Sequence, residues 1–290
     1  MVMGYTNRVI LLFTVINPIF FSFTFFFPLT AANAQTGFSV RSDVDDQLYS
    51  IDLPSGVATP IGATGFADIE CLTFDASGVL YGVDDITNQL LICDTSTGAC
   101  NAVGPLGVAF TDCGLTFDCN GELFMSTDAP APLTLYSIDP NTGQATAVGD
   151  QGQQVTGLAG AAATAICGSG VYGLGGDGTN NLGCMDLFTG AFEEIGPLNT
   201  VNVSDGGIDF DLQGRLWGIQ DEGLIFIITP STGAASGVTA TLNGFEGLAI
   251  DAPSCEPRTI PTMSEWGLIL MAGILGIVGF IVYRRKMTAA

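Results

Sequence analysis

The sequence contains no histidine and little positive charge: seven Lys and Arg residues stand against 29 Asp and Glu, a net charge of -22. Between residues 35 and 255 the bases are Arg41 and Arg215 alone. Without histidine there is no Ser-His or Cys-His nucleophile pair, and without bases the usual clamps for phosphate or carboxylate substrates are missing. Nucleic acid is excluded as a partner because its binding needs clustered Lys or Arg. We therefore predict a protein that is not an enzyme.

The start of the chain has the order of a secretory signal peptide. Arg8 precedes a long apolar segment, which ends in Ala32-Asn33-Ala34. A positive start, an apolar middle and small residues at Ala32 and Ala34 are typical of a cleavable signal. We expect residues 1–34 to engage the Sec translocon and to be removed after Ala34. An uncleaved anchor helix is the alternative, because two prolines interrupt the long apolar segment.

A second apolar segment, residues 266–283, is followed directly by Arg284, Arg285 and Lys286. Its length is close to the roughly 20 residues that a helix needs to cross a hydrocarbon core of about 30 Å. The basic cluster is a membrane stop that stays in the cytoplasm, which places the preceding residues outside. We expect a single transmembrane helix here, which anchors the exported domain.

Eight cysteines lie outside these two apolar segments. In an exported protein, disulfides are their first interpretation, and zinc is disfavoured because the sequence has neither histidine nor a CxxC pair. Cys93 and Cys100 flank a predicted hairpin turn and are the expected disulfide pair. Cys71 with Cys113 is a further option between neighbouring repeats. The complete connectivity of eight cysteines stays open at this level.

A turn that ends in glycine recurs five times along the chain. Successive copies are 42, 45, 47 and 43 residues apart, and their glycines are Gly56, Gly98, Gly143, Gly190 and Gly233. Between the turns lie short alternating apolar segments, and these indicate about four strands per repeat. Four antiparallel strands in 40 to 50 residues are typical of a propeller blade.

The first repeat is incomplete, because it begins at Gly37 without its first strand. The missing strand reappears at residues 247–251, so one blade is shared between the two ends of the domain. Such sharing closes the ring and protects its edges. We predict an all-β, five-bladed β-propeller over residues 37–253, followed by a linker at 254–259. A solenoid is the structural alternative, although it would not need the permuted first copy.

The segment after the linker carries an ordered motif, with Ile260, Pro261, Thr262, Met263, Trp266 and Gly267. Residues 260–290 resemble the IPTL-CTERM sorting signal, with Met263 where that family usually has Leu. The resemblance implies a bacterial substrate of an exosortase, which cuts the anchor near the motif. A generic single-pass anchor is the alternative. The repeats themselves resemble the LTFDxxGxLYG type of secreted bacterial propellers, which implies the fold but no particular activity.

Four aspartates end the first strands of their repeats: Asp75, Asp118, Asp211 and Asp251. One hypothesis is that they ring a mouth of the central channel and bind Ca²⁺, which prefers several oxygen ligands. The competing interpretation, which we favour, is that each Asp opens a turn that a following Gly closes. No other cofactor is expected.

These patterns together predict an exported protein of a Gram-negative bacterium. It would first be anchored in the inner membrane and then, after exosortase processing, lie at the cell surface or in the extracellular matrix. Its propeller would interact with matrix polymer, cells or cations. The alternative function is a secreted Ca²⁺-dependent hydrolase or lyase acting on polysaccharide.

Overall fold

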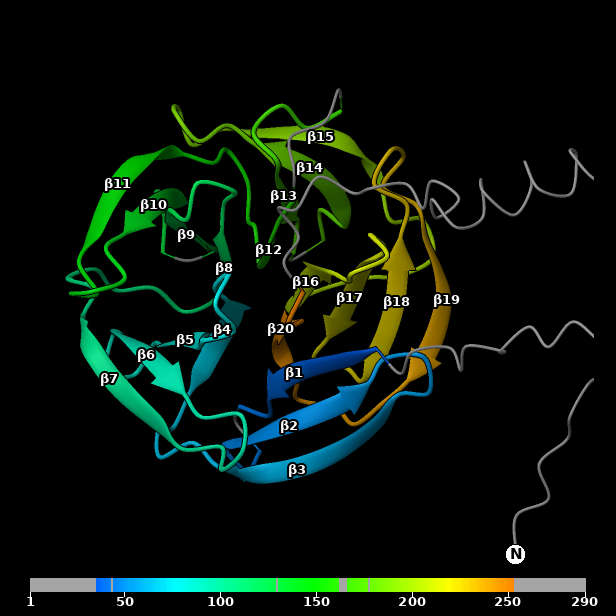
Figure 1. Cartoon of the computed structure of the whole chain (residues 1–290). Helices are drawn as coiled ribbons and strands as arrows, with labels where there is room; N and C mark the ends of the chain where they lie inside the picture. The colour runs from blue at the N-terminus through cyan, green and yellow to red at the C-terminus, as the bar shows by residue number, and fades with distance from the viewer. Residues whose placement is uncertain (1–34, 43, 129, 162–165, 177, 253–290) are drawn as a thin grey trace, which may run out of the picture. The chain divides into compact units, whose positions relative to one another are not determined.

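The computed structural model describes residues 35–252, except 43, 129, 162–165 and 177. These residues form twenty β-strands in five antiparallel sheets of four strands each. Each sheet is one blade, and the blades stand around a common centre (Figure 1). The all-β, five-bladed propeller is therefore confirmed.

Several predictions fall on residues outside the described part of the chain. These are the signal peptide with Ala32 and Ala34, the sorting motif from Ile260 to Gly267, and the basic cluster Arg284 to Lys286. Within the described part, no helix has the length and apolar character needed to cross a membrane.

The blades are named here by their strands. The first contains β20 (Glu246–Ala249), β1 (Thr36–Val40), β2 (Gln47–Asp52) and β3 (Val57–Ala63). The second contains β4 (Ile69–Phe74), β5 (Leu80–Asp84), β6 (Gln89–Cys93) and β7 (Cys100–Pro105). The third contains β8 (Cys113–Phe117), β9 (Leu123–Thr127), β10 (Thr134–Ile138) and β11 (Ala145–Asp150). The fourth contains β12 (Gly157–Gly160), β13 (Val171–Leu174), β14 (Asn181–Met185) and β15 (Phe192–Pro197). The fifth contains β16 (Gly206–Phe210), β17 (Leu216–Gln220), β18 (Leu224–Ile228) and β19 (Ala235–Ala240).

The first blade closes the ring. Strand β20 pairs with β1 in antiparallel register, with Phe38 opposite Ala249. The Ser39 hydroxyl donates hydrogen bonds to the carbonyl oxygens of Glu246 (2.8 Å) and Gly247 (2.7 Å). Strands from the two ends of the propeller thus share one sheet, as the incomplete first repeat predicted.

The repeated glycine turns follow from backbone chemistry and blade packing. Gly98 adopts a φ of 83°, a conformation that suits glycine, and the Asp94 carboxylate accepts a hydrogen bond from the backbone N–H of Ser96 (2.7 Å). A second glycine six residues later lets the next blade approach closely. A Cβ on Gly104 would lie 2.2 Å from the carbonyl oxygen of Thr142, which belongs to the turn of the next blade. The two glycines of the repeat therefore lie where neighbouring blades contact each other.

The innermost strands β4, β8, β12, β16 and β20 contact one another in cyclic order around the centre. Glycines allow this approach, since a Cβ on Gly207 would lie 2.2 Å from the backbone nitrogen of Leu248. Leucine and isoleucine side chains complete the lining: Leu72, Leu115, Leu158, Ile208 and Leu248. The space between these strands is too small for a water molecule. The centre is therefore closed between these strands.

Two disulfides join described cysteines. Cys93 and Cys100, the expected pair, link β6 to β7 within one blade. Cys71 and Cys113 link the innermost strands β4 and β8 of neighbouring blades. Cys119 is also disulfide-bonded. The prediction of a disulfide-bonded domain is confirmed.

Cys167 and Cys184 are buried and stand outside these disulfides. A hydrogen bond from the Cys184 thiol lowers the pKa of Cys167 to about 7, and the same contact raises the pKa of Cys184. The expectation that the cysteines pair in disulfides does not extend to these two in the structure.

A carboxylate cluster at one mouth of the propeller

The aspartates that end the first strands close hairpin turns. Asp75 Oδ1 accepts hydrogen bonds from the backbone N–H groups of Ser77 (2.8 Å) and Val79 (2.9 Å). Asp118 and Asp211 make the equivalent pair of contacts in their own blades. None of these three, nor Asp251, belongs to a group of described acids close enough to share a metal ion. Ca²⁺ binding by them stays a prediction, and their turn contacts match the competing interpretation.

A different set of acids gathers where the innermost strands begin. Asp68 and Glu70 flank the first residue of β4, and Asp85 follows β5. Asp112 and Asp205 directly precede β8 and β16, and Glu246 opens β20. We call these six residues the mouth cluster: Asp68, Glu70, Asp85, Asp112, Asp205 and Glu246.

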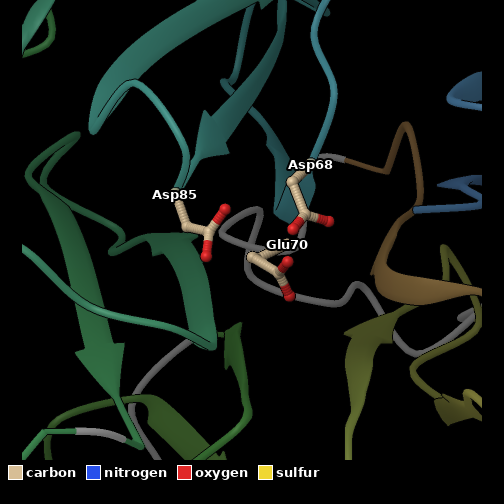
Figure 2. A group of neighbouring side chains, drawn as sticks. All are labelled: Asp68, Glu70 and Asp85. Atoms are coloured by element: carbon tan, nitrogen blue, oxygen red, sulfur yellow. The ribbon is translucent and has the colours of Figure 1, made fainter. Parts of the chain in front are cut away.

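One group of three acids in the mouth cluster comes from a single hairpin. Asp68, Glu70 and Asp85 each offer one carboxylate oxygen, and these oxygens lie within 4.8 Å of one another. Their side chains point toward one another (Figure 2). The hairpin sets this arrangement, because the Asp85 backbone N–H donates to the Asp68 carbonyl (3.1 Å). A register irregularity after Ile69 in the pairing of β4 with β5 falls at Glu70.

A second group of three, which shares Glu70 with the first group and does not include Glu246, spans three blades. One carboxylate oxygen each from Glu70, Asp112 and Asp205 lies within 4.8 Å of the other two. Strands β4 and β8 are tied at this level by the disulfide, because Cys71 follows Glu70 and Cys113 follows Asp112. Asp205 comes from the fifth blade, so this group depends on closure of the ring.

Burial and like charges raise the pKa values of four residues of the mouth cluster, Glu70, Asp85, Asp205 and Glu246. Burial, followed by the charge of Glu246, raises the pKa of Glu70 well above its usual range. Burial and the charge of Asp112 likewise raise the pKa of Asp205. Burial and Asp68 raise the pKa of Asp85 to about 7, and burial raises that of Glu246 to about 8. Ionisation of these four carboxyls is thus unfavourable in the folded protein.

No basic side chain within the described ranges offsets this charge. Arg41 pairs with Asp45 (2.9 Å) and Arg215 with Asp211 (2.6 Å), and neither acid belongs to the mouth cluster. Buried carboxylates normally keep a counter-ion or hydrogen-bond donors. The negative charge of the mouth cluster therefore has no basic partner among the described residues, and a bound cation would neutralise it.

Three carboxylate oxygens of the cluster are buried without a hydrogen-bond partner: Glu70 Oε2, Asp85 Oδ1 and Glu246 Oε2. Glu70 is only 5% exposed, and a buried acceptor without a donor costs free energy. All ligands are oxygens, the donor type that Ca²⁺ and Mg²⁺ prefer over softer metals. Oxygens bound at about 2.3–2.6 Å from one Ca²⁺ lie up to about 5 Å apart, which fits both groups of three.

The four aspartates predicted as metal ligands lie at the opposite ends of the innermost strands from the mouth cluster. The signal that could have found the mouth cluster is an acid shortly before the central apolar residue of each first strand. Glu70 precedes Leu72 by two positions, whereas Asp112 precedes Leu115 by three. The two spacings hide the pattern, and Thr156 replaces the acid before β12.

Comparisons with solved structures agree with the propeller. A nidogen/laminin complex matches with 11% identity and a TM-score of 0.50, covering 77% of this chain and 87% of that chain. Regucalcin, a calcium-binding protein from Agrobacterium tumefaciens, matches with 16% identity and a TM-score of 0.44 over 77% of this chain and 80% of its own. Virginiamycin B lyase from Staphylococcus aureus matches with 17% identity and a TM-score of 0.42 over 70% and 69%. Likenesses of this size show the fold alone. The search of curated proteins finds no match.

The prediction that the protein is not an enzyme is wrong as a deduction from residue types. One of the solved structures named above is a lyase. Propellers host many functions, so the fold by itself gives no ground for excluding catalysis. The lack of histidine does not exclude it either, because carboxyls can act as general acids and bases when their pKa values approach neutrality. Asp85 and Glu246, with pKa values raised to about 7 and about 8, meet that condition.

The C-terminal resemblance is confirmed by a family model. Residues 259–286 match the IPTL-CTERM motif, which covers the sorting residues quoted above. The match supports a C-terminal sorting signal on an exported, surface-associated protein. The chain is therefore a sorted surface protein that combines an IPTL-CTERM motif with a five-bladed β-propeller.

Proposed function

We propose that this propeller is a Ca²⁺-binding surface module, exported by a Gram-negative bacterium and processed by an exosortase, which contacts extracellular polymer through its mouth cluster. The observation that carries the proposal is the Glu70 carboxylate, buried among five other acids with an oxygen that accepts no hydrogen bond. A divalent cation supplies the missing partner and offsets the like charges.

Polymer binding follows from the unfilled coordination of such an ion. Ca²⁺ takes about six to eight oxygen ligands, and each group in the mouth cluster offers three residues. Asp85, Asp112 and Asp205 are half-buried, so the ion would keep a face toward solvent. Hydroxyl or carboxylate oxygens of a polysaccharide can complete the coordination there.

Calorimetric titration with Ca²⁺ tests the binding. We expect the EDTA-treated protein to bind Ca²⁺, and Glu70→Gln to weaken binding at least tenfold because it removes a buried charged ligand. Glu194→Gln makes the same chemical change on the exposed face of β15 and serves as the matched control. Failure of the wild-type protein to bind Ca²⁺ at millimolar concentration would refute the proposal.

The export half of the proposal is tested on the mature chain. Residues 1–34 are proposed as signal peptide and 260–290 as sorting signal, with 266–283 spanning the membrane. Mass spectrometry of protein from cells that contain an exosortase should find Gln35 at the N-terminus and a C-terminus near Ile260–Gly267. Without the exosortase, the C-terminal segment should remain. Identical C-termini in both cells would contradict processing.

A second candidate function is a Ca²⁺-dependent hydrolase or lyase that acts on polysaccharide at the same mouth. It is favoured by carboxyl pKa values near neutrality beside a proposed ion, because a general acid or base works best with a pKa close to the ambient pH. An activity screen on polysaccharides, with and without EDTA, separates the two. Metal-dependent turnover that Asp85→Asn abolishes would support the enzyme, whereas binding without turnover would support the module.

A further inference from the structure

We propose that the mouth cluster holds two divalent cations that share Glu70 as a bridging ligand. This inference rests on the proposed Ca²⁺ binding and adds the number of ions and the residues that serve each. One ion would lie among Asp68, Glu70 and Asp85, and the other among Glu70, Asp112 and Asp205.

The geometry of the acids carries the division into two sites. Each group of three places its carboxylate oxygens within 4.8 Å of one another, and Glu70 is the member that both groups contain. The first group lies in one hairpin of the second blade, whereas the second joins three blades. A carboxylate has two oxygens and can therefore contact two ions at once. Glu70 is the residue placed to do so.

The charge of the cluster also favours two ions. A cation binds the ionised form of a carboxylate and displaces its proton. With all six carboxylates ionised the cluster carries six negative charges, of which one divalent cation leaves four and two cations leave two. The described part of the chain has its two bases, Arg41 and Arg215, paired elsewhere. Since a buried like-charge group is costly in a medium of low polarity, the second ion relieves repulsion that the first leaves in place.

Glu70 gives the observation that is independent of the clustering. It is 5% exposed, and its Oε2 accepts no hydrogen bond. Figure 2 shows its carboxylate beside that of Asp68. Glu246, whose side chain contacts Glu70, also has a buried oxygen without a donor. A bound cation would supply the missing partner of each of these two oxygens.

The number of bound ions tests the inference. Native mass spectrometry and calorimetry of the full chain in detergent should give two Ca²⁺ per wild-type protein and two for the control Glu194→Gln. Asp85→Asn and Asp205→Asn should each retain one, because each removes a ligand from one site. Glu70→Gln should lose both, with at least a tenfold weakening of each. Melting curves in EDTA verify that the variants fold.

Crystals soaked in Sr²⁺ give a second measurement that does not depend on variants. Two anomalous peaks on either side of the Glu70 carboxylate are expected. One peak, or a wild-type stoichiometry of one, overturns the two-ion inference while leaving the proposed function intact. A stoichiometry of zero overturns both. If Asp85→Asn and Asp205→Asn both abolish the same single ion, the division into two sites is wrong.

Discussion

At the scale of single residues, the mouth cluster couples protonation to stability. Burial raises the pKa of Glu246 from 4.5 to about 8 and that of Asp85 from 3.8 to about 7. Between about pH 4 and pH 8 the folded protein therefore keeps these two carboxyls protonated, whereas the same carboxyls are ionised in the unfolded chain. Linkage then requires the free energy of unfolding to fall as the pH rises through this window.

We expect the metal-free protein to lose about 2 kcal/mol of unfolding free energy between pH 5 and pH 8, an estimate reduced for the partial exposure of the cluster. Glu70→Gln removes one of the interacting charges and should flatten this dependence, with greater stability than wild type at pH 8. Urea unfolding in EDTA at several pH values measures both effects. A wild-type stability that rises from pH 5 to pH 8 would contradict the assignment.

The pKa values of the turn aspartates shift in the opposite direction, down instead of up. These shifts set the lowest pH at which the experiment reports on the mouth cluster. Hydrogen bonds from Ser96 lower the pKa of Asp94, and hydrogen bonds from Asn141 and Thr142 lower that of Asp139. Their contribution is present above the unfolded pKa and is lost as the pH falls below it. Measurements that stay at or above pH 5 therefore report mainly on the mouth cluster.

Residue chemistry within one turn was predictable, whereas the mouth cluster was not. An Asp that opens a turn closed by Gly acts on backbone groups two to four positions away, so Asp75 and Asp118 could be interpreted from sequence. Glu70 meets Asp205 only because the chain closes a ring between positions 135 residues apart. No local pattern contains that contact.

At the scale of elements, glycine spacing predicted the repeats, and the structure shows what the second glycine of each repeat contacts. Gly104 in β7 faces the turn of the next blade, where an added Cβ would lie 2.2 Å from the Thr142 carbonyl oxygen. Gly62, Gly149 and Gly196 stand in the same relation to Thr97, Thr189 and Thr232. The recurrence of the contact explains why the second glycine follows the first at a fixed distance in four repeats.

We expect Gly104→Ala to destabilise the propeller by about 1–3 kcal/mol, because the methyl group must displace the backbone of a neighbouring blade. Gly168→Ala is the matched control, since a Cβ there meets no atom within 4 Å. The control should change stability by less than about 0.5 kcal/mol. Denaturant unfolding compares the two variants, and equal stability would show that the blades can separate without cost.

At the scale of the whole molecule, the incomplete first repeat predicted ring closure before any contact was known. The pairing of β1 with β20 realises it, and Ser39 adds two side-chain contacts across the junction. The sequence could not predict that closure of the ring also closes its centre. The close approach of Gly207 to Leu248 involves two strands that meet only in the folded ring. The closed centre has no room for a ligand between the innermost strands.

A cation bound at the mouth cluster should consequently link separate blades of the ring and stabilise the propeller. Glu70, Asp112 and Asp205 come from the second, third and fifth blades, so an ion bound to all three opposes separation of the fifth blade from the second and third. Ligand binding to the folded state at 100 times Kd adds about 2.7 kcal/mol, and for a domain of this size that corresponds to a rise in Tm of roughly 5–10 °C.

Thermal melts at pH 7.5 with EDTA and with excess Ca²⁺ test this prediction. Wild type and Glu194→Gln should show the full rise in Tm. Asp205→Asn should lose more than half of it, because this variant removes the ligand that reaches across from the fifth blade. Asp85→Asn should lose less, since its partners lie in the same hairpin and hold no second blade in place. An equal loss in the two variants would mean that the ion stabilises the hairpin alone. A Tm that does not change on addition of Ca²⁺ would show that no ion links the blades.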